Sequence, residues 1–168
     1  SKNNFWHRLC SWIWLPLAYR SGIKFAQVRG TDDKSFSVML PFRRFNRNWY
    51  NAMAGAALLA NSEVAGGMYV FQKCGGDYTV VCKELQYKFM RPCVGPALYR
   101  VTPLEDIEEK VRTGAEFNIT VEMNVVQMVT TGGEEKERRV GVCTATFHVM
   151  PKTMARRRKQ RPRAKSRA

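Results

Sequence analysis

The stretch that decides the fold is NRNWYNAMAGAALLANSEVAGGMYVFQ, residues 46–72. From Ala52 to Phe71 its residues are apolar or small on every side, except at Asn61, Ser62 and Glu63. This pattern is typical of a helix that is buried almost all round. A transmembrane span is the alternative, because the run is about long enough to cross a bilayer. Alanine and glycine give it little hydrophobic weight, however, and strands are predicted on both sides, so we favour the buried helix.

The composition is that of one globular domain with a charged extension. The chain has 168 residues, of which 45% are hydrophobic, and a formal net charge of +14. Residues 152–168 hold nine of the basic side chains and no acid, so the rest of the chain carries 14 − 9 = +5. We therefore expect one domain over residues 1–151 and a disordered tail over residues 152–168. The basic side chains from Lys152 to Arg167 are suited to binding nucleic acid or an anionic surface, and a solvated extension is the alternative.

The cysteines and the amino end give information about the compartment. Five cysteines are scattered along the chain without a C-x-x-C pair, which favours neither a zinc site nor a complete disulfide framework and fits a reducing, cytoplasmic compartment. Residues 1–21 form a tryptophan-rich segment that contains Pro16, and its apolar run is too short to span a bilayer. We expect an amphipathic helix that packs on the domain or on a second subunit, with membrane attachment as the alternative.

Short strands are predicted on both sides of the central helix. Residues 23–30 and 34–40 are predicted to pair as a hairpin. In residues 78–92, the odd positions Val81, Leu85, Tyr87 and Phe89 are apolar and the even positions are polar, which predicts a strand with one wet face. Lys83 breaks this alternation on the apolar side.

The second half of the chain adds three more strands. Residues 95–103 form one predicted strand, and the acidic residues 104–110 form a helical turn. Residues 115–131 and 134–151 are joined by Gly132–Gly133, and a Gly-Gly connection is a strong hairpin signal. If the two glycines are central in this turn, the numbers of opposed residues sum to 265, which places Phe117 opposite His148.

The order of elements predicts an antiparallel sheet wrapped around one helix. Two strands precede the helix, four follow it, and no second helix is long enough for a parallel crossover. A sheet with one apolar face must cover something, and the helix of residues 52–71 is the candidate, since its small side chains allow close approach. The strand Tyr78–Met90 is predicted to lie at an edge, where it would join two copies of the chain into a dimer.

This arrangement resembles the hotdog fold, an α+β fold in which about six antiparallel strands enclose a long helix, and in particular the small thioesterase-like branch of that superfamily. The resemblance covers roughly residues 15–151. It rests on NRNWYNAMAGAALLANSEVAGG, and then on PLAYRSGIKF before the first strand and FMRPCVG after the post-helix strand. It implies action on acyl thioesters of coenzyme A or of acyl-carrier protein, in dimers or dimers of dimers with sites between subunits. It implies no cofactor besides the coenzyme A thioester that serves as substrate.

The resemblance also implies roles for residues around the helix start. Asn48 matches an asparagine that places the thioester or the water, and Gly55 matches a glycine whose backbone N–H faces the thioester carbonyl. It places Asn51, Met53 and Ala54 beside the substrate, and Met53 stands where many relatives carry histidine.

The acidic position of the family falls on Ser62 when it is counted from Gly55, and Glu63 comes one residue later. One residue is about 100° of helix rotation. We consider Glu63 as a base whose pKa is raised in an apolar pocket, with a polar window of Asn61, Ser62 and Glu63 facing solvent or a partner as the equal alternative.

Other chemistries are less well supported. A hydratase would need a histidine at the helix start, and the chain has only His7 and His148, the latter predicted at the edge of the core. No cysteine has a histidine neighbour in the sequence that would make it a nucleophile. Three hypotheses follow: a thioesterase, a non-catalytic module that binds an acyl ligand or a protein, and a nucleic-acid-binding protein that acts through its tail.

Overall fold

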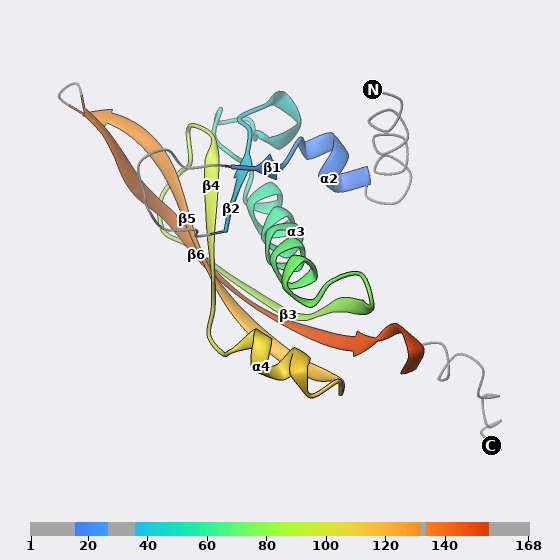
Figure 1. Cartoon of the computed structure of the whole chain (residues 1–168). Coiled ribbons are helices and arrows are strands. Elements are labelled where there is room, and N and C mark those ends of the chain that lie inside the picture. Colours follow the sequence, from blue (N-terminus) through green and yellow to red (C-terminus); the bar gives the residue numbers. More distant parts are fainter. Residues whose placement is uncertain (1–15, 27–35, 132–133, 155–168) are drawn as a thin grey trace, which may run out of the picture.

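The computed structural model describes residues 16–26, 36–131 and 134–154, which form one antiparallel sheet and a long helix that lies across it (Figure 1). The sheet holds six strands in the order β1-β2-β4-β5-β6-β3, and every neighbouring pair is antiparallel. The elements are α2 (Pro16–Ser21), β1 (Lys24–Phe25), β2 (Ser37–Leu40), the 3₁₀ helix η1 (Arg44–Asn46), α3 (Gly55–Cys74), β3 (Tyr78–Phe89), β4 (Ala97–Pro103), α4 (Ile107–Arg112), β5 (Phe117–Thr131) and β6 (Glu134–Pro151).

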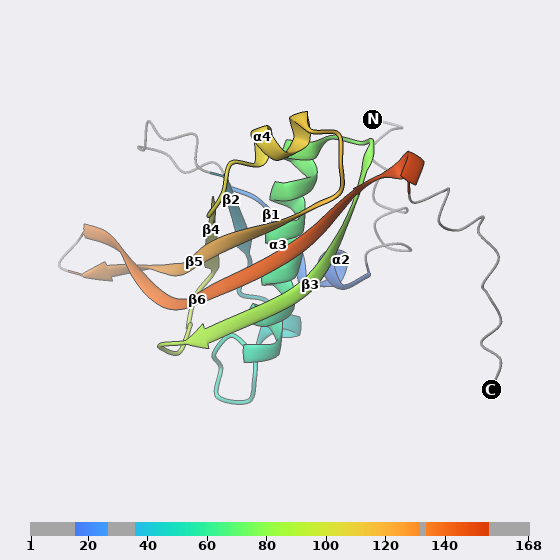
Figure 2. The same ribbon diagram turned by 90° about the horizontal axis from the view of Figure 1, so that it is seen from below.

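The predicted architecture is confirmed. The sheet curves around α3, as Figure 2 shows from below, and this is the hotdog arrangement. Two strands precede α3 and four follow it, α4 is the expected helical turn, and β3 is an edge strand. The helix ends at Cys74, where Gly75 takes φ +80 and donates its N–H to the carbonyl of Phe71 at 2.9 Å.

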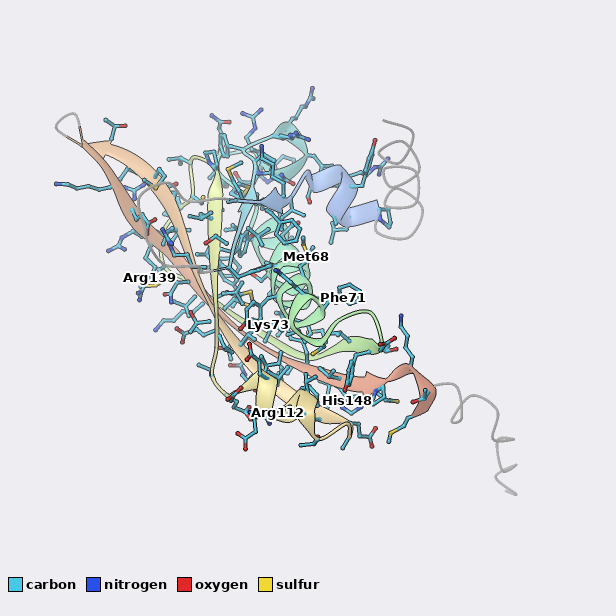
Figure 3. The ribbon with its side chains drawn as sticks, in the orientation of Figure 1. Met68, Phe71, Lys73, Arg112, Arg139 and His148 are labelled. Atoms are coloured by element: carbon cyan, nitrogen blue, oxygen red, sulfur yellow. The ribbon has the colours of Figure 1, made fainter. Side chains whose placement is uncertain are left out.

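The inner face of α3 packs on the sheet through small side chains. An ideal Cβ on Gly66 would lie 2.8 Å from the ring of Phe147, so a larger residue would push helix and sheet apart. The helix is nevertheless not buried almost all round, as the sequence predicted, because Glu63 and Phe71 are exposed. Met68 and Phe71 project from the side of α3 that faces away from the sheet (Figure 3).

The predicted register of the last hairpin is correct only near its turn. From Val126↔Arg139 to Thr131↔Glu134 the paired numbers sum to 265, but from Phe117↔Val149 to Val125↔Gly141 they sum to 266. Val140 is the extra residue, and its carbonyl accepts bonds from the N–H groups of Met90 at 3.0 Å and Arg91 at 3.2 Å. The bulge shifts the pairing by one residue, so Phe117 lies opposite apolar Val149 instead of His148.

A second bulge explains why Lys83 interrupts the alternation in β3. The pairs Cys82↔Phe147 and Glu84↔Thr146 leave Lys83 as the extra residue. Before the bulge the inward side chains are at even positions, and after it they are at odd positions. Leu85 and Tyr87 therefore pack on the core as predicted, whereas Val81 is 55% exposed.

Buried polar groups connect the amino-terminal part to the central helix. Ser21 Oγ donates to Asn61 Oδ1 at 2.8 Å, and Asn46 Nδ2 donates to the carbonyl of Ser21 at 2.8 Å. All three residues have no solvent exposure. Asn61 is therefore part of an internal network and not of a window onto solvent.

Some predictions fall outside the described residues. Of the predicted amino-terminal helix, the structure describes only α2, and residues 1–15 lie outside the described ranges. Residues 155–168 also lie outside them, so the role of the basic tail stays a prediction. In the part of the chain that the structure describes, no helix is both long and apolar enough to cross a membrane.

Candidate functional site

The candidate site begins at the amino end of α3. Ala54 occupies the N-cap position and has no side-chain acceptor, and the N–H of Leu58 is the first to reach an acceptor within the helix, at 3.0 Å from the carbonyl of Ala54. The N–H groups of Gly55, Ala56 and Ala57 therefore have no partner inside the helix and point along its axis. Such a helix start is suited to binding an oxyanion.

Gly55 lies close to the end of the edge strand. An ideal Cβ at this position would be 3.2 Å from the ring of Phe89, which is tighter than an ordinary contact. The absence of a side chain thus leaves the first turn of α3 open beside this ring. Phe89 is 56% exposed, so the helix start lies at the surface of the single chain.

Asn48 holds the turn that leads into the helix. Its Oδ1 accepts the N–H groups of Tyr50 at 3.0 Å and Ala52 at 3.1 Å. Its backbone N–H also donates to the carbonyl of Ala52 at 2.9 Å. The side-chain oxygen is thereby used by the protein, and Nδ2 is the part of the amide that can donate to a ligand.

The structure places the other predicted substrate-binding residues around the same turn. Met53 is buried, and its N–H donates to the carbonyl of Cys93 at 2.7 Å. The N–H of Ala54 donates to the carbonyl of Asn46 at 2.8 Å. Asn51 is exposed, has φ 54, and accepts a bond from Arg47 Nη1 at 2.6 Å. These three residues lie together as predicted, but Met53 brings no titratable group to the helix start.

The two candidates for the acidic position point in different directions. Ser62 is fully buried, and its Oγ donates to the carbonyl of Leu58 at 2.9 Å. Glu63 is exposed, on the flank of α3 that faces β3. Burial, and after it the negative charge of Glu63, raises the pKa of the Cys82 thiol in β3. Glu63 is thus not enclosed in an apolar pocket within one chain, contrary to the sequence prediction.

Glu63 and the helix start are too far apart to act on one bond in a single chain. Eight residues separate Gly55 from Glu63, which is about 12 Å along the helix axis. A thioester carbonyl that accepts hydrogen bonds from the first turn of α3 is therefore out of reach of the Glu63 carboxylate in the same chain.

The remaining nucleophiles and bases are not placed for catalysis at this site. Burial raises the pKa of the Cys143 thiol to about 11 and also raises that of Cys93, so both stay protonated at neutral pH. His148 lies on the outer face of the sheet, with Nδ1 2.9 Å from Asn118 Oδ1 (Figure 3). Among the described residues, no group of three or more His, Cys, Asp or Glu side chains could hold a metal ion.

Two neighbours of the helix start were not found in the sequence. Phe89 and Cys93 contact the turn and the first residue of α3, although they follow the helix by many residues. The bulge in β3 sets which side of the strand faces the helix, so alternation alone gave no signal for them.

Comparison with known proteins supports the fold. No protein-family model matches the chain, and no curated protein sequence matches it. Among solved structures, a thioesterase from Haemophilus influenzae has a TM-score of 0.61 at 14% identity, covering 80% of this chain and 82% of the other. A thioesterase family protein from Silicibacter pomeroyi has a TM-score of 0.64 at 14% identity, covering 86% and 96%.

A third solved structure, of a Bacillus halodurans protein crystallised with CoA, has a TM-score of 0.58 at 21% identity, covering 80% of this chain and 75% of the other. At these identities the likeness is one of fold. The chain therefore has the hotdog fold, which it shares with proteins described as thioesterases.

Proposed function

We propose that this protein hydrolyses acyl thioesters of coenzyme A or of acyl-carrier protein. The observation that carries the proposal is the open start of α3, where the N–H groups of Gly55, Ala56 and Ala57 lie next to the turn held by Asn48. A thioester carbonyl gains negative charge when water attacks it, and donors at a helix start stabilise that charge. Proteins of the same fold that are described as thioesterases, and one crystallised with CoA, support this assignment.

We further propose that two copies of the chain form each site. The distance of about 12 Å between Gly55 and Glu63 requires that the carboxylate come from a second copy. The edge strand β3 is available for pairing and exposes Val81 and Phe89, which are 55% and 56% accessible. Light scattering at the concentrations used in the assay tests this, and an active monomer contradicts it.

The proposed reaction uses one water molecule. The Gly55 N–H binds the carbonyl oxygen, and Asn48 Nδ2 orients the thioester or the water. Glu63 of the partner subunit accepts a proton from the water as its oxygen bonds to the carbonyl carbon. The tetrahedral intermediate then breaks its carbon–sulfur bond, and the proton passes to the departing sulfur, so that a carboxylic acid and a thiol are formed. Ser62 is the other candidate for the water, but its buried hydroxyl donates to Leu58, so we assign it to packing.

An acyl-CoA panel of different chain lengths, assayed with wild type and Glu63→Gln, tests the function. We expect hydrolysis by wild type and a loss of about a hundredfold or more in kcat for Glu63→Gln, in line with the contribution of a general base. Glu109→Gln, which changes an exposed carboxylate on α4, is the matched control and keeps full activity. Absence of hydrolysis for every chain length, or an unaffected Glu63→Gln enzyme, overturns the assignment.

The burial of Met53 favours a second candidate, a non-catalytic hotdog module that binds an acyl ligand or a protein partner. With Met53 in the core, the helix start holds no titratable side chain of its own. Mass spectrometry of the purified protein tests this candidate. A copurified acyl ligand without turnover supports it, whereas hydrolysis at about 1 per second or faster excludes it.

A further inference from the structure

Two aromatic side chains project from the turn that precedes the candidate site. Trp49 is 97% exposed and Tyr50 is 86% exposed, the highest values among the large hydrophobic side chains of the described residues. The N–H of Asn51 donates to the carbonyl of Asn48 at 3.2 Å, so the two aromatics are the central residues of a β-turn. In Figure 2 the segment between β2 and α3, in teal, projects beyond the start of α3. Large rings held this far into solvent are suited to stacking against a flat ligand.

The turn is fixed before any ligand binds. Asn48 Oδ1 accepts two backbone N–H groups inside it, and Arg47 Nη1 donates to Asn51 Oδ1 at 2.6 Å. Arg47 also pairs with Met53 in an isolated antiparallel bridge, and its guanidinium lies 5.2 Å from the centre of the Phe42 ring. Because the backbone is already ordered, a ligand on the two aromatics loses little affinity to ordering the loop.

The segment that leads into the turn is positively charged. Arg43 and Arg44 are exposed, and no Asp or Glu occurs in the sequence between Asp33 and Glu63. The guanidinium of Arg43 lies against Gly22, at the end of α2. Arginine binds phosphate through paired N–H donors, so this surface combines phosphate-binding groups with stacking groups.

The same turn is joined directly to the start of α3. Only Asn51 to Ala54 separate Tyr50 from Gly55, and this connection is fixed by the bonds from Met53 N–H to Cys93 and from Ala54 N–H to Asn46. A ligand that stacks on Trp49 or Tyr50 therefore lies on the approach to the proposed thioester site. Coenzyme A has the matching order of groups, namely an adenine ring, phosphates, a flexible pantetheine arm and the thioester.

We propose that Trp49, Tyr50, Arg43 and Arg44 form a binding site for the nucleotide half of coenzyme A, in which adenine stacks on an aromatic ring and the phosphates bind the arginines. This proposal rests on the proposed function and selects coenzyme A over acyl-carrier protein, because a carrier protein presents pantetheine without adenine. Single-stranded nucleic acid also stacks on aromatic and basic surfaces. The direct connection to the start of α3 favours a ligand that carries a thioester on the same molecule.

Isothermal titration calorimetry with 3′,5′-ADP, which carries the adenine and phosphates of coenzyme A without the thioester, tests the site independently of hydrolysis. We expect wild type to bind, and Trp49→Leu and the double variant Arg43→Ser/Arg44→Ser each to bind at least about fivefold more weakly, the lower end for loss of one stacking contact. Arg112→Ser is the control, because it removes an exposed arginine from α4 (Figure 3). Helix α4 contacts α3 near its other end through Lys73 and Glu108, and α3 is about 30 Å long. Equal binding by all variants, or none by wild type, overturns the proposal.

A kinetic comparison separates this site from the thioesterase function. The ratio of kcat/KM for acyl-CoA to that for the same acyl group on pantetheine should fall in Trp49→Leu and in the double arginine variant, and stay constant in Arg112→Ser. Binding of 3′,5′-ADP that depends on these residues, with no thioester hydrolysed, supports the site and rejects the function. Hydrolysis with an unchanged ratio supports the function and rejects the site. Binding of a single-stranded RNA oligonucleotide through the same residues, without binding of 3′,5′-ADP, rejects the site as a coenzyme A site.

Discussion

Gly66 of α3 lies directly beneath the ring of Phe147 in β6, and an added Cβ would be 2.8 Å from one ring carbon and 3.3 Å from a methyl carbon of Val121. Both neighbours belong to strands at the centre of the sheet and have at most 2% exposure. The closeness of helix and sheet therefore depends on the absence of a side chain at residue 66.

Gly66→Ala should destabilise the protein by about 1–3 kcal/mol, the usual cost of overpacking a core. Gly67→Ala is the matched control, because a Cβ there would lie 3.6 Å from the Phe147 ring, an ordinary contact. At that position alanine should stabilise the helix by up to about 1 kcal/mol. Urea denaturation of the two variants measures the difference, and equal stabilities would contradict the packing described here.

The buried bond between Ser21 and Asn61 should be visible as a coupling energy. Asn61→Ala leaves Ser21 Oγ without its 2.8 Å acceptor, and we expect a loss of about 1–3 kcal/mol in the free energy of unfolding. Ser21→Ala in the Asn61→Ala background should cost less than in wild type, with a coupling of about 1 kcal/mol. Strictly additive single effects would show that the two side chains do not stabilise each other.

Asn48→Asp should separate the structural role of this side chain from its proposed catalytic role. Aspartate keeps the oxygen that accepts the N–H groups of Tyr50 and Ala52, so the stability should stay within about 0.5 kcal/mol of wild type. It lacks Nδ2, so thioester hydrolysis should fall about tenfold or more. Asn48→Ala should lower both. If Asn48→Asp is fully active, the amide does not orient the substrate or the water.

Stability should fall in alkaline solution because of the buried thiols. Burial raises the pKa of Cys143 from 9.0 to about 11, and a bond with Ser62 offsets part of this rise. Between these values the unfolded thiol loses its proton while the folded thiol keeps it, so stability is full below pH 9 and declines as the pH rises towards 11. Urea midpoints across this range should decline less steeply for Cys143→Ala. Parallel declines would assign the effect to other groups, such as Cys74, whose pKa burial also raises to about 11.

Much of the fold could be predicted because its signals are local. The small residues of α3, the glycines after Cys74 and the polar-apolar alternation of the strands are all read within one element, and each predicted element is present where it lies in the described residues. The two bulges could not be predicted. Val140 and Lys83 are extra residues only relative to their partner strands, and the shift they cause depends on which side chains the core accepts.

The candidate site was predicted less completely because its parts come from distant segments. Asn48, Met53 and Gly55 lie together as expected, since they share one turn. The direction of Glu63 and the burial of Ser62 depend on how α3 is rotated against the sheet, and one residue of helix changes that by about 100°. The exposure of Trp49 depends on a turn held by side-chain bonds, which composition does not reveal.

The bulge at Lys83 also affects how the protein behaves in a concentrated solution. An exposed edge strand can add further strands without limit, which is how many proteins begin to aggregate. In β3 the extra residue interrupts the regular row of backbone donors and acceptors near its middle and adds a positive charge there. An incoming strand can therefore match this edge only if it follows the same bend, so the bulge restricts growth of the sheet beyond one specific pairing.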